Sequence, residues 1–455
     1  MTDYIDDSRV LPSSVRYSQI TPLAVEGKAL QKKMLPISSG PYTNNNPVCR
    51  INISSGSEFL DTQNSYLKFT LTNSDAQTCQ VDSSGHSLIK RIRIVARSGG
   101  PDIEVLLNYN QLAGMLSDLQ ASADHRQSIH GYLSGYGNGG NLTALTTTNS
   151  ILADGLVNHI TGVISDEAKA LINPLNYGCN EDKITQNNSR TFLINLVSVL
   201  GNLSQKYIPL FLTGDLLLEL EFDPTALVYG TAPAGGSQVM SISSVEYVAH
   251  CVEFGGDIVD KLRSAVMSNG LYIHLSQFRN YSTNVVAGMN NVMLQERLKS
   301  VRALLVGFNK TAITPVDRLT HRYNNTLKTF QVKVGSQYYP PQQLTADRAD
   351  STQVEMIANT FLALSEFNNI HNCPCINKEQ FFKNDASTSL QVGRAIYGMD
   401  FEAFSKSSTM CGVNTVVNSP MIVQFTGDTV CQGNFFLCYD SILAIKQDGT
   451  TIMVN

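Results

Sequence analysis

The chain has 455 residues, of which 42% are hydrophobic and 16% are charged, and its formal net charge at pH 7 is −5. This length exceeds the size at which a single hydrophobic core usually keeps growing, so we expect two domains. The acidic balance argues against nonspecific binding of nucleic acid by the whole surface. No run can span a bilayer, because the most apolar stretch, Phe192–Leu200, is short and Lys206 and Asp215 interrupt its continuation.

Nine cysteines are scattered along the chain, and residues 1–10 are acidic and polar, so we expect no signal peptide. An odd number of cysteines without such a signal favours reduced thiols in a cytosolic or nuclear setting. We therefore predict that all of them are free thiols. They are Cys49, Cys79, Cys179, Cys251, Cys373, Cys375, Cys411, Cys431 and Cys438.

Residues 1–44 show no hydrophobic periodicity, because their apolar side chains are isolated and four prolines separate them. Lys28, Lys32 and Lys33 form a small basic cluster. Two interpretations are open, a flexible leader or an extended arm that becomes ordered on a neighbouring subunit.

Strand patterns begin at Val48. Ser65–Thr72 alternates apolar and polar side chains, which is typical of a half-buried strand. Ser87–Val95 repeats the pattern with isoleucines on one face and basic residues on the other, namely Ile92 and Ile94 against Arg91 and Arg93. We interpret this basic ladder, which Lys90 extends, as a solvated strand face or a contact with another subunit rather than a nucleic-acid site.

A helix is predicted next, because Leu112, Leu116 and Leu119 recur at the spacing of one helical face. Gly131–Asn188 follows and is rich in glycine and polar residues. An insertion of this length in a compact domain is usually a functional surface, so we expect an outward-facing loop. Strand patterns then return at Arg190–Leu200.

The centre of the chain predicts a joint between two β domains. Asp215–Phe222 and Val239–Phe254 have strand patterns, and the helical pattern 257–267 follows them. In this helix Ile258, Leu262 and Val266 share one face, which we expect to pack against both domains and set their angle. The strand patterns beyond it are 271–275, 292–294, 301–308, 329–334, 421–425, 434–439, 442–445 and 452–454.

A second helical stripe lies among these later strands, at Val354, Ile357, Phe361 and Leu364. Each half of the chain therefore has early strands, one short helix, irregular sequence and closing apolar strands. No residue-level repeat is visible, so the pattern indicates a duplication of architecture alone.

No catalytic constellation is evident, since the sequence has no phosphate-binding loop, dinucleotide fingerprint or nucleophile elbow. Asp400 and Glu402 could be paired carboxylates, but an exposed strand face is the simpler interpretation. His371, Cys373 and Cys375 form the one metal-like cluster, although its spacing lacks the usual partner pair, which favours buried or loop thiols. We assign no catalytic, cofactor-binding or metal-binding residue and expect no enzyme activity and no cofactor.

The order of these segments resembles the double jelly-roll major capsid proteins of polinton-like viruses, virophages and the adenovirus-like lineage. The carrying segments are Phe59–Phe69, Ile103–Leu119, Ile208–Leu220 and Phe435–Val454, and the resemblance covers nearly all of the chain after residue 45. It implies an all-β fold of two tandem eight-stranded jelly rolls. The implied domains are an N-terminal arm at 1–44, a first roll at 45–255 and a second roll at 256–455 that opens with the linker helix 257–267.

The resemblance also implies a function. Three copies would form a pseudo-hexagonal capsomer, and many capsomers would tile an icosahedral shell. Implied partners are neighbouring capsomers, penton proteins and minor (cement) capsid proteins, with no specific nucleic acid. The implied location is the virion, after assembly in the host cytoplasm or nucleus.

Two other functions fit a tandem β protein. A glycan-binding or glycan-cleaving β-sandwich is possible because jelly rolls also host lectins and hydrolases. The absence of Trp counts against it, since sugars commonly stack on aromatic rings, but the chain's 18 Tyr could substitute. The other is a non-viral scaffold built on tandem jelly rolls.

Overall fold

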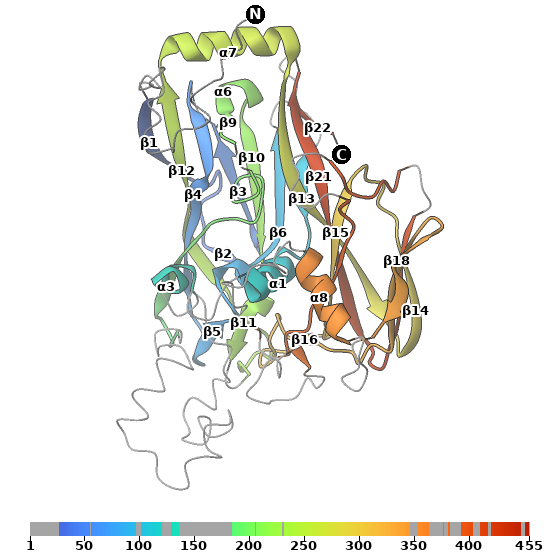
Figure 1. Ribbon diagram of the computed structural model, residues 1–455. Helices are drawn as coiled ribbons and strands as arrows, with labels where there is room; N and C mark the ends of the chain where they lie inside the picture. The colour runs from blue at the N-terminus through green and yellow to red at the C-terminus, as the bar shows by residue number, and fades with distance from the viewer. Residues whose placement is uncertain are drawn as a thin grey trace, which may run out of the picture.

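The structure is a computed structural model, and it describes residues 27–54, 56–96, 102–120, 129–135, 184–204, 206–229, 232–345, 353–363, 376, 381–382, 393–403, 410–416, 420–446 and 451–454. The described chain is built mainly from β-sheets arranged in two halves that stand side by side (Figure 1). Among these residues, no helix has the length and apolar character needed to cross a membrane.

The first half contains two main sheets whose strands all pair antiparallel. One sheet has the order β1-β12-β4-β8, and the other has the order β3-β10-β6-β7. The bounds are β1 (Gly27–Met34), β3 (Val48–Ile53), β4 (Phe59–Thr72), β6 (Ile89–Ala96), β7 (Asp102–Leu106), β8 (Ser189–Ile194), β10 (Leu216–Phe222) and β12 (Ser241–Phe254).

The second half repeats this arrangement. One sheet has the order β13-β21-β15, in which β15 also pairs with β19, and the other has the order β14-β20-β17-β18. The bounds are β13 (Leu271–Val285), β14 (Gly288–Leu294), β15 (Val301–Asn309), β17 (Thr329–Val334), β18 (Gln337–Leu344), β19 (Tyr397–Asp400), β20 (Met421–Gly427) and β21 (Cys431–Ile445).

The two halves have the same topology. When the eight main strands of each half are counted from its own first strand, one sheet runs 1-8-3-6 and the other runs 2-7-4-5 in both cases. This strand order defines an eight-stranded jelly roll. The predicted fold class, two tandem jelly rolls with few short helices, is therefore confirmed, and so is a duplication of architecture without a sequence repeat.

Short elements complete the rolls. The additional strands are β2 (Tyr42–Thr43), β5 (Cys79–Val81), β9 (Ile208–Pro209), β11 (Leu227–Tyr229), β16 (Arg322–Tyr323) and β22 (Thr451–Val454). The α-helices are α1 (Tyr109–Gln120), α3 (Ile129–Ser134), α6 (Leu210–Thr213), α7 (Gly256–Asn269) and α8 (Gln353–Ala363), and the 3-10 helices are η3 (Gly85–Leu88) and η8 (Pro224–Ala226). Helix α7 lies across one end of both rolls and links β12 to β13, whereas α1 and α8 lie toward the other end (Figure 1).

The first strand of the first roll lies inside the segment that we assigned to an N-terminal arm. Strand β1 pairs with β12 along its whole length, from Gly27 opposite Phe254 to Met34 opposite Tyr247. Residues 27–34 are thus part of the sheet, and the roll begins before residue 45. The strand was missed because it lies at a sheet edge, where lysines replace the apolar alternation. Residues 1–26 lie outside the described residues, and an arm there remains a prediction.

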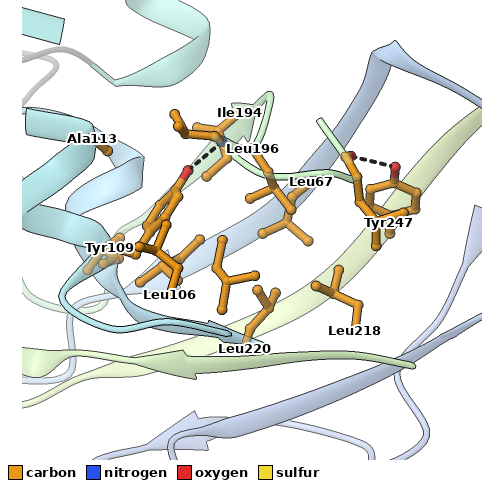
Figure 2. Close-up of a cluster of buried hydrophobic side chains, with 14 of the residues drawn as sticks. Leu67, Leu106, Tyr109, Ala113, Ile194, Leu196, Leu218, Leu220 and Tyr247 are labelled. Carbon is orange, nitrogen blue, oxygen red and sulfur yellow. Dashed lines mark hydrogen bonds between the residues drawn. The ribbon is translucent and has the colours of Figure 1, made fainter. Parts of the chain in front are cut away.

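The core of the first roll lies between its two sheets, as the alternation of β4 and β10 predicted. Leu67, Leu218 and Leu220 are fully buried, and so is Tyr247 from β12 (Figure 2). The Tyr247 hydroxyl donates to the carbonyl of Leu200 at 2.9 Å, so burial of this large ring leaves no unpaired hydroxyl.

Candidate functional site: the seam between the two rolls

The contact between the two rolls, which we call the seam, is centred on α1. One side of this helix faces its own roll, where Leu112, Leu116 and Leu119 are buried, so the predicted stripe is confirmed. Tyr109 belongs to the same side. Its oxygen accepts from the backbone N–H of Val197 at 3.1 Å (Figure 2).

The other side of α1 carries polar residues toward the second roll. The Gln111 amide nitrogen donates to the Leu319 carbonyl at 2.7 Å, and its oxygen accepts from the Asn309 amide at 3.0 Å. Just before the helix, Asn108 donates to Asn280 at 3.0 Å and to Ser282 at 2.8 Å. These bonds are directional, so they hold the rolls in one relative orientation.

A buried ionic cluster completes this side of α1. Asp118 is 2% exposed and accepts from two arginines of the second roll, Arg322 and Arg394. Arg322 is 0% exposed. A buried carboxylate shared by two guanidinium groups is stable only as a complete unit, because any partner left alone would be an uncompensated charge in a medium of low dielectric.

A second carboxylate crosses the seam nearby. Asp82, which follows β5, accepts from the backbone N–H of Thr320 at 2.7 Å and from its hydroxyl at 2.8 Å. The Arg318 guanidinium lies 3.4 Å from the same carboxylate. Both Asp82 and Thr320 are buried. The seam therefore carries two ionic clusters in addition to the amide contacts.

Apolar packing is continuous across the seam. One hydrophobic cluster contains most of the first roll's core together with buried side chains of the second roll. Those side chains are Ile273, Leu275, Phe278, Leu305, Leu319, Ile396, Phe436 and Leu443. The two rolls therefore share part of a core, although most buried side chains of the second roll form a separate cluster. This contact distinguishes them from two domains joined by a linker alone.

The linker helix α7 contributes less to the rolls' packing than we predicted. Val259 and Val266 are buried, but Ile258 is 39% exposed and Leu262 is only half-buried. The predicted face Ile258/Leu262/Val266 was therefore right at Val266 and wrong at Ile258, where the neighbouring Val259 is buried instead. The rolls are oriented mainly by α1, whose polar residues were not recognised. The available signal was the group of three amide side chains, Asn108, Asn110 and Gln111, at the start of an apolar stripe.

The basic ladder on β6 forms ion pairs within its own sheet. Arg91 contacts Glu219 at 2.9 Å and Glu221 at 3.1 Å on the neighbouring β10. Arg93 contacts Asp102 on β7 at 2.9 Å, on a face where both side chains are partly exposed. These arginines therefore form a charge-balanced strand face, which agrees with the solvated-face interpretation.

Asp400 and Glu402 do not form a facing pair of carboxylates. Glu402 is paired with Arg302 of β15, and Asp400 accepts from the backbone N–H of Glu402 at 3.0 Å. Burial raises the pKa of Asp400. The Glu402 side chain is mostly buried, so the expected exposed strand face is wrong. Each carboxylate already has a structural partner.

Two sequence features lie largely outside the described residues. The cluster His371, Cys373 and Cys375 is outside them, and so is most of Gly131–Asn188, of which the structure describes 131–135 and 184–188. In the part of the chain that is described, no group of three or more His, Cys, Asp or Glu side chains could hold a metal ion. Five described cysteines are free thiols, as predicted for them, namely Cys49, Cys79, Cys251, Cys431 and Cys438.

Helix α8 follows the fifth strand of the second roll, just as α1 follows the fifth strand of the first. Its buried residues are Met356 and Thr360, whereas Val354 is 65% exposed. The predicted stripe is therefore right in part, because Ile357 and Phe361 are partly buried against the hydrophobic clusters whereas Val354 is not. Thr360 fixes the helix by accepting from the backbone N–H of Gly398 in β19 at 2.9 Å.

Comparisons with known proteins identify the architecture. No protein-family model and no curated protein sequence matches the chain. Among solved structures, PBCV-1 VP54 aligns with a TM-score of 0.58 at 10% identity, covering 96% of this chain and 99% of its own. The Faustovirus major capsid protein aligns with a TM-score of 0.55 at 10% identity, covering 97% and 94%. The mavirus major capsid protein aligns with a TM-score of 0.51 at 11% identity, covering 100% and 95%. The chain therefore has the double jelly-roll fold that these viral proteins share.

Proposed function

We propose that this protein is a major capsid protein that assembles as a homotrimer into pseudo-hexagonal capsomers of an icosahedral virus shell. The likeness to the Faustovirus and mavirus major capsid proteins extends over nearly the whole of this chain and of theirs. The function therefore belongs to the two rolls themselves.

The observation that carries the proposal is the shared core with its ionic seam. A shell of many copies needs subunits that keep one shape while they contact different neighbours. In this chain a continuous hydrophobic cluster and the Asp118 pairs with Arg322 and Arg394 hold the two rolls as a single block. Three such blocks around a threefold axis would place six similar rolls at six corners, because both rolls have the same topology.

The finer parts of the proposal concern partners and location. We place the protein in the virion, assembled in the cytoplasm or nucleus of a host cell, with neighbouring capsomers, penton proteins and cement proteins as partners. The N-terminal residues 1–26 would form an arm under the shell, and the insertion within 131–188 would face outward. The roll boundary would lie at the start of α7, near residue 256.

The test is the mass and shape of the purified full-length protein. Sedimentation should give a stable trimer, and negative-stain images should show six-cornered particles or closed shells. The same preparation should be applied to a glycan array. A monomer that binds glycans would replace the capsid proposal with the lectin-like alternative, and a non-binding monomer would refute the capsomer.

A further inference from the structure

Edge strands of the described sheets are protected in different ways. Free sheet edges attract other strands, and proteins usually block them with charge, proline or a covering segment. Strand β1 carries Lys28, Lys32 and Lys33, and β18 carries Pro340 and Pro341. Helix α3 contacts β8, and β7 is covered by contacts with β13 and β22 of the second roll.

Strand β14 lies at the edge of its sheet and shows none of these protections. Its sequence, GMNNVML, contains no charged residue and no proline. It pairs with β20 along one edge, and no other described backbone segment pairs with its outer edge. On its outer face Met289 is 71% exposed and Met293 is 44% exposed. An uncharged edge with exposed methionines is a favourable site for strand addition.

The equivalent edge of the first roll shows that the position can be covered. The second strand of that roll, β3, has its outer edge occupied by the preceding segment, where Pro36 bridges Ile51 and the N–H of Ile37 donates to the Arg50 carbonyl at 2.8 Å. In the second roll only Val286 and Ala287 separate β13 from β14. This connection is too short to run back along the edge of β14. A segment that pairs with this edge therefore has to come from another part of the chain or from another molecule.

The sequence of β14 indicates a second copy of the same strand. Antiparallel self-pairing centred on Asn291 would place Asn291 opposite Asn291 and Met289 opposite Met293 of the other copy, all on the exposed face. The order of side chains on the strand is thus complementary to itself, as a twofold contact requires. We propose that β14 pairs with β14 of a second copy across a twofold axis, forming one continuous sheet. If the proposed function holds, this contact joins neighbouring capsomers, but the pairing itself does not depend on it.

Register-specific disulfide formation tests the pairing in the full-length protein. Side chains directly opposite in an antiparallel pair lie close enough to form a disulfide. Asn291→Cys should therefore give a dimer-sized band under mild oxidation that the wild type lacks. Met289→Cys alone should not, because its partner is Met293, whereas the double variant Met289→Cys/Met293→Cys should. Absence of the Asn291→Cys band, or equal bands for Met289→Cys and Asn291→Cys, would overturn the proposal.

A charge at the centre of the strand provides an independent test. Asn291→Lys would place two lysines opposite each other and should abolish association between trimers, or between monomers if no trimer forms. The matched control is Ala29→Lys, on the exposed edge β1 that already carries lysines. Sedimentation should show that Asn291→Lys loses this association and that Ala29→Lys keeps it. Unchanged association of Asn291→Lys would refute the contact. A wild-type protein that forms no trimer would instead refute the capsomer.

Discussion

Asp118 joins parts of the chain that are far apart in the sequence. It lies 204 residues from Arg322 and 276 residues from Arg394, yet both guanidinium groups contact its carboxylate in the buried seam. Such a cluster can contribute little net stability compared with a well-packed apolar core. Breaking it by removing one partner is costly, because the remaining charges stay buried.

We expect Asp118→Ala to lower the free energy of unfolding by about 3–5 kcal/mol, the range found when one partner of a buried pair is removed. The matched control is Asp102→Ala, which removes the partner of Arg93 from a pair whose side chains are 38% and 39% exposed. That change should cost at most about 1 kcal/mol, because water screens the pair. Chemical denaturation of both variants measures the difference. Equal losses would mean that the seam cluster is not specially important.

The burial of the Glu104 carboxyl group leads us to expect an unusual dependence of the free energy of unfolding on pH. It lies in β7 with its side chain in the core of the first roll, where one oxygen accepts from the Val199 N–H at 3.0 Å and from the Ser198 hydroxyl. Its other oxygen has no described partner. Burial raises the pKa of Glu104 from 4.5 to about 7, against the opposing effect of these hydrogen bonds.

Since the folded protein holds this proton more tightly than the unfolded chain, the stabilisation is complete below about pH 4.5 and is lost as the pH rises through 7. Glu104→Gln cannot ionise and should remove this loss. The free energy of unfolding of the variant minus that of the wild type should therefore increase from pH 5 to pH 8. A difference that is constant over this interval would show that Glu104 does not titrate there.

At the residue scale, the sequence predicts which face of a strand is buried but not which distant residues a buried charge contacts. The alternation in β6 correctly placed Ile92 and Ile94 inside and Arg91 and Arg93 outside, because a strand's two faces follow directly from its period. Asp118 appears in the sequence as an ordinary polar position of a helix. Its role depends on a tertiary contact that local pattern does not encode.

At the scale of elements, α7 predicts a sharp contrast between its faces. Val266 is 4% exposed and Ile258 is 39% exposed on the same helix. Val266→Asp would bury an unpaired carboxylate and should cost about 3 kcal/mol or more. Ile258→Asp should be tolerated, because its carboxylate would reach water and also lies near the helix N-terminus. Thermal unfolding compares the two, and similar losses would contradict the observed burial.

Elements with strong hydrophobic periodicity were predictable from the sequence, whereas an element at a sheet edge was not. The strand patterns in the middle of each roll appeared where expected, since both sheets bury one face. Strand β1 was missed because its exposed edge is rich in lysine. In α8 the helix and part of its packed face were recognised, namely Ile357 and Phe361, but the buried Thr360 was not, because a threonine does not stand out in an apolar pattern.

At the scale of the whole molecule, the shared core predicts cooperative unfolding. Leu275 and Phe436 of the second roll belong to the same hydrophobic cluster as Leu67 and Leu220 of the first. Neither roll can open without exposing part of the other's core, so we expect one unfolding transition. Hydrogen exchange should show loss of protection in β10 and β17 at the same denaturant concentration. Two separated transitions would show that the rolls are energetically independent.

The polar character of the seam has a consequence for synthesis. The first roll leaves the ribosome before the second exists, and domains generally fold in that order. During that interval Asn108, Gln111 and Asp118 can be hydrated, whereas an interface of leucines in the same place would attract other nascent chains. Their hydrogen bonds to water are exchanged for bonds to Asn280, Leu319 and Arg322 only when the second roll arrives. The polar half of the seam thus limits the apolar surface that a half-made molecule exposes, which would suit the many copies that the proposed shell requires.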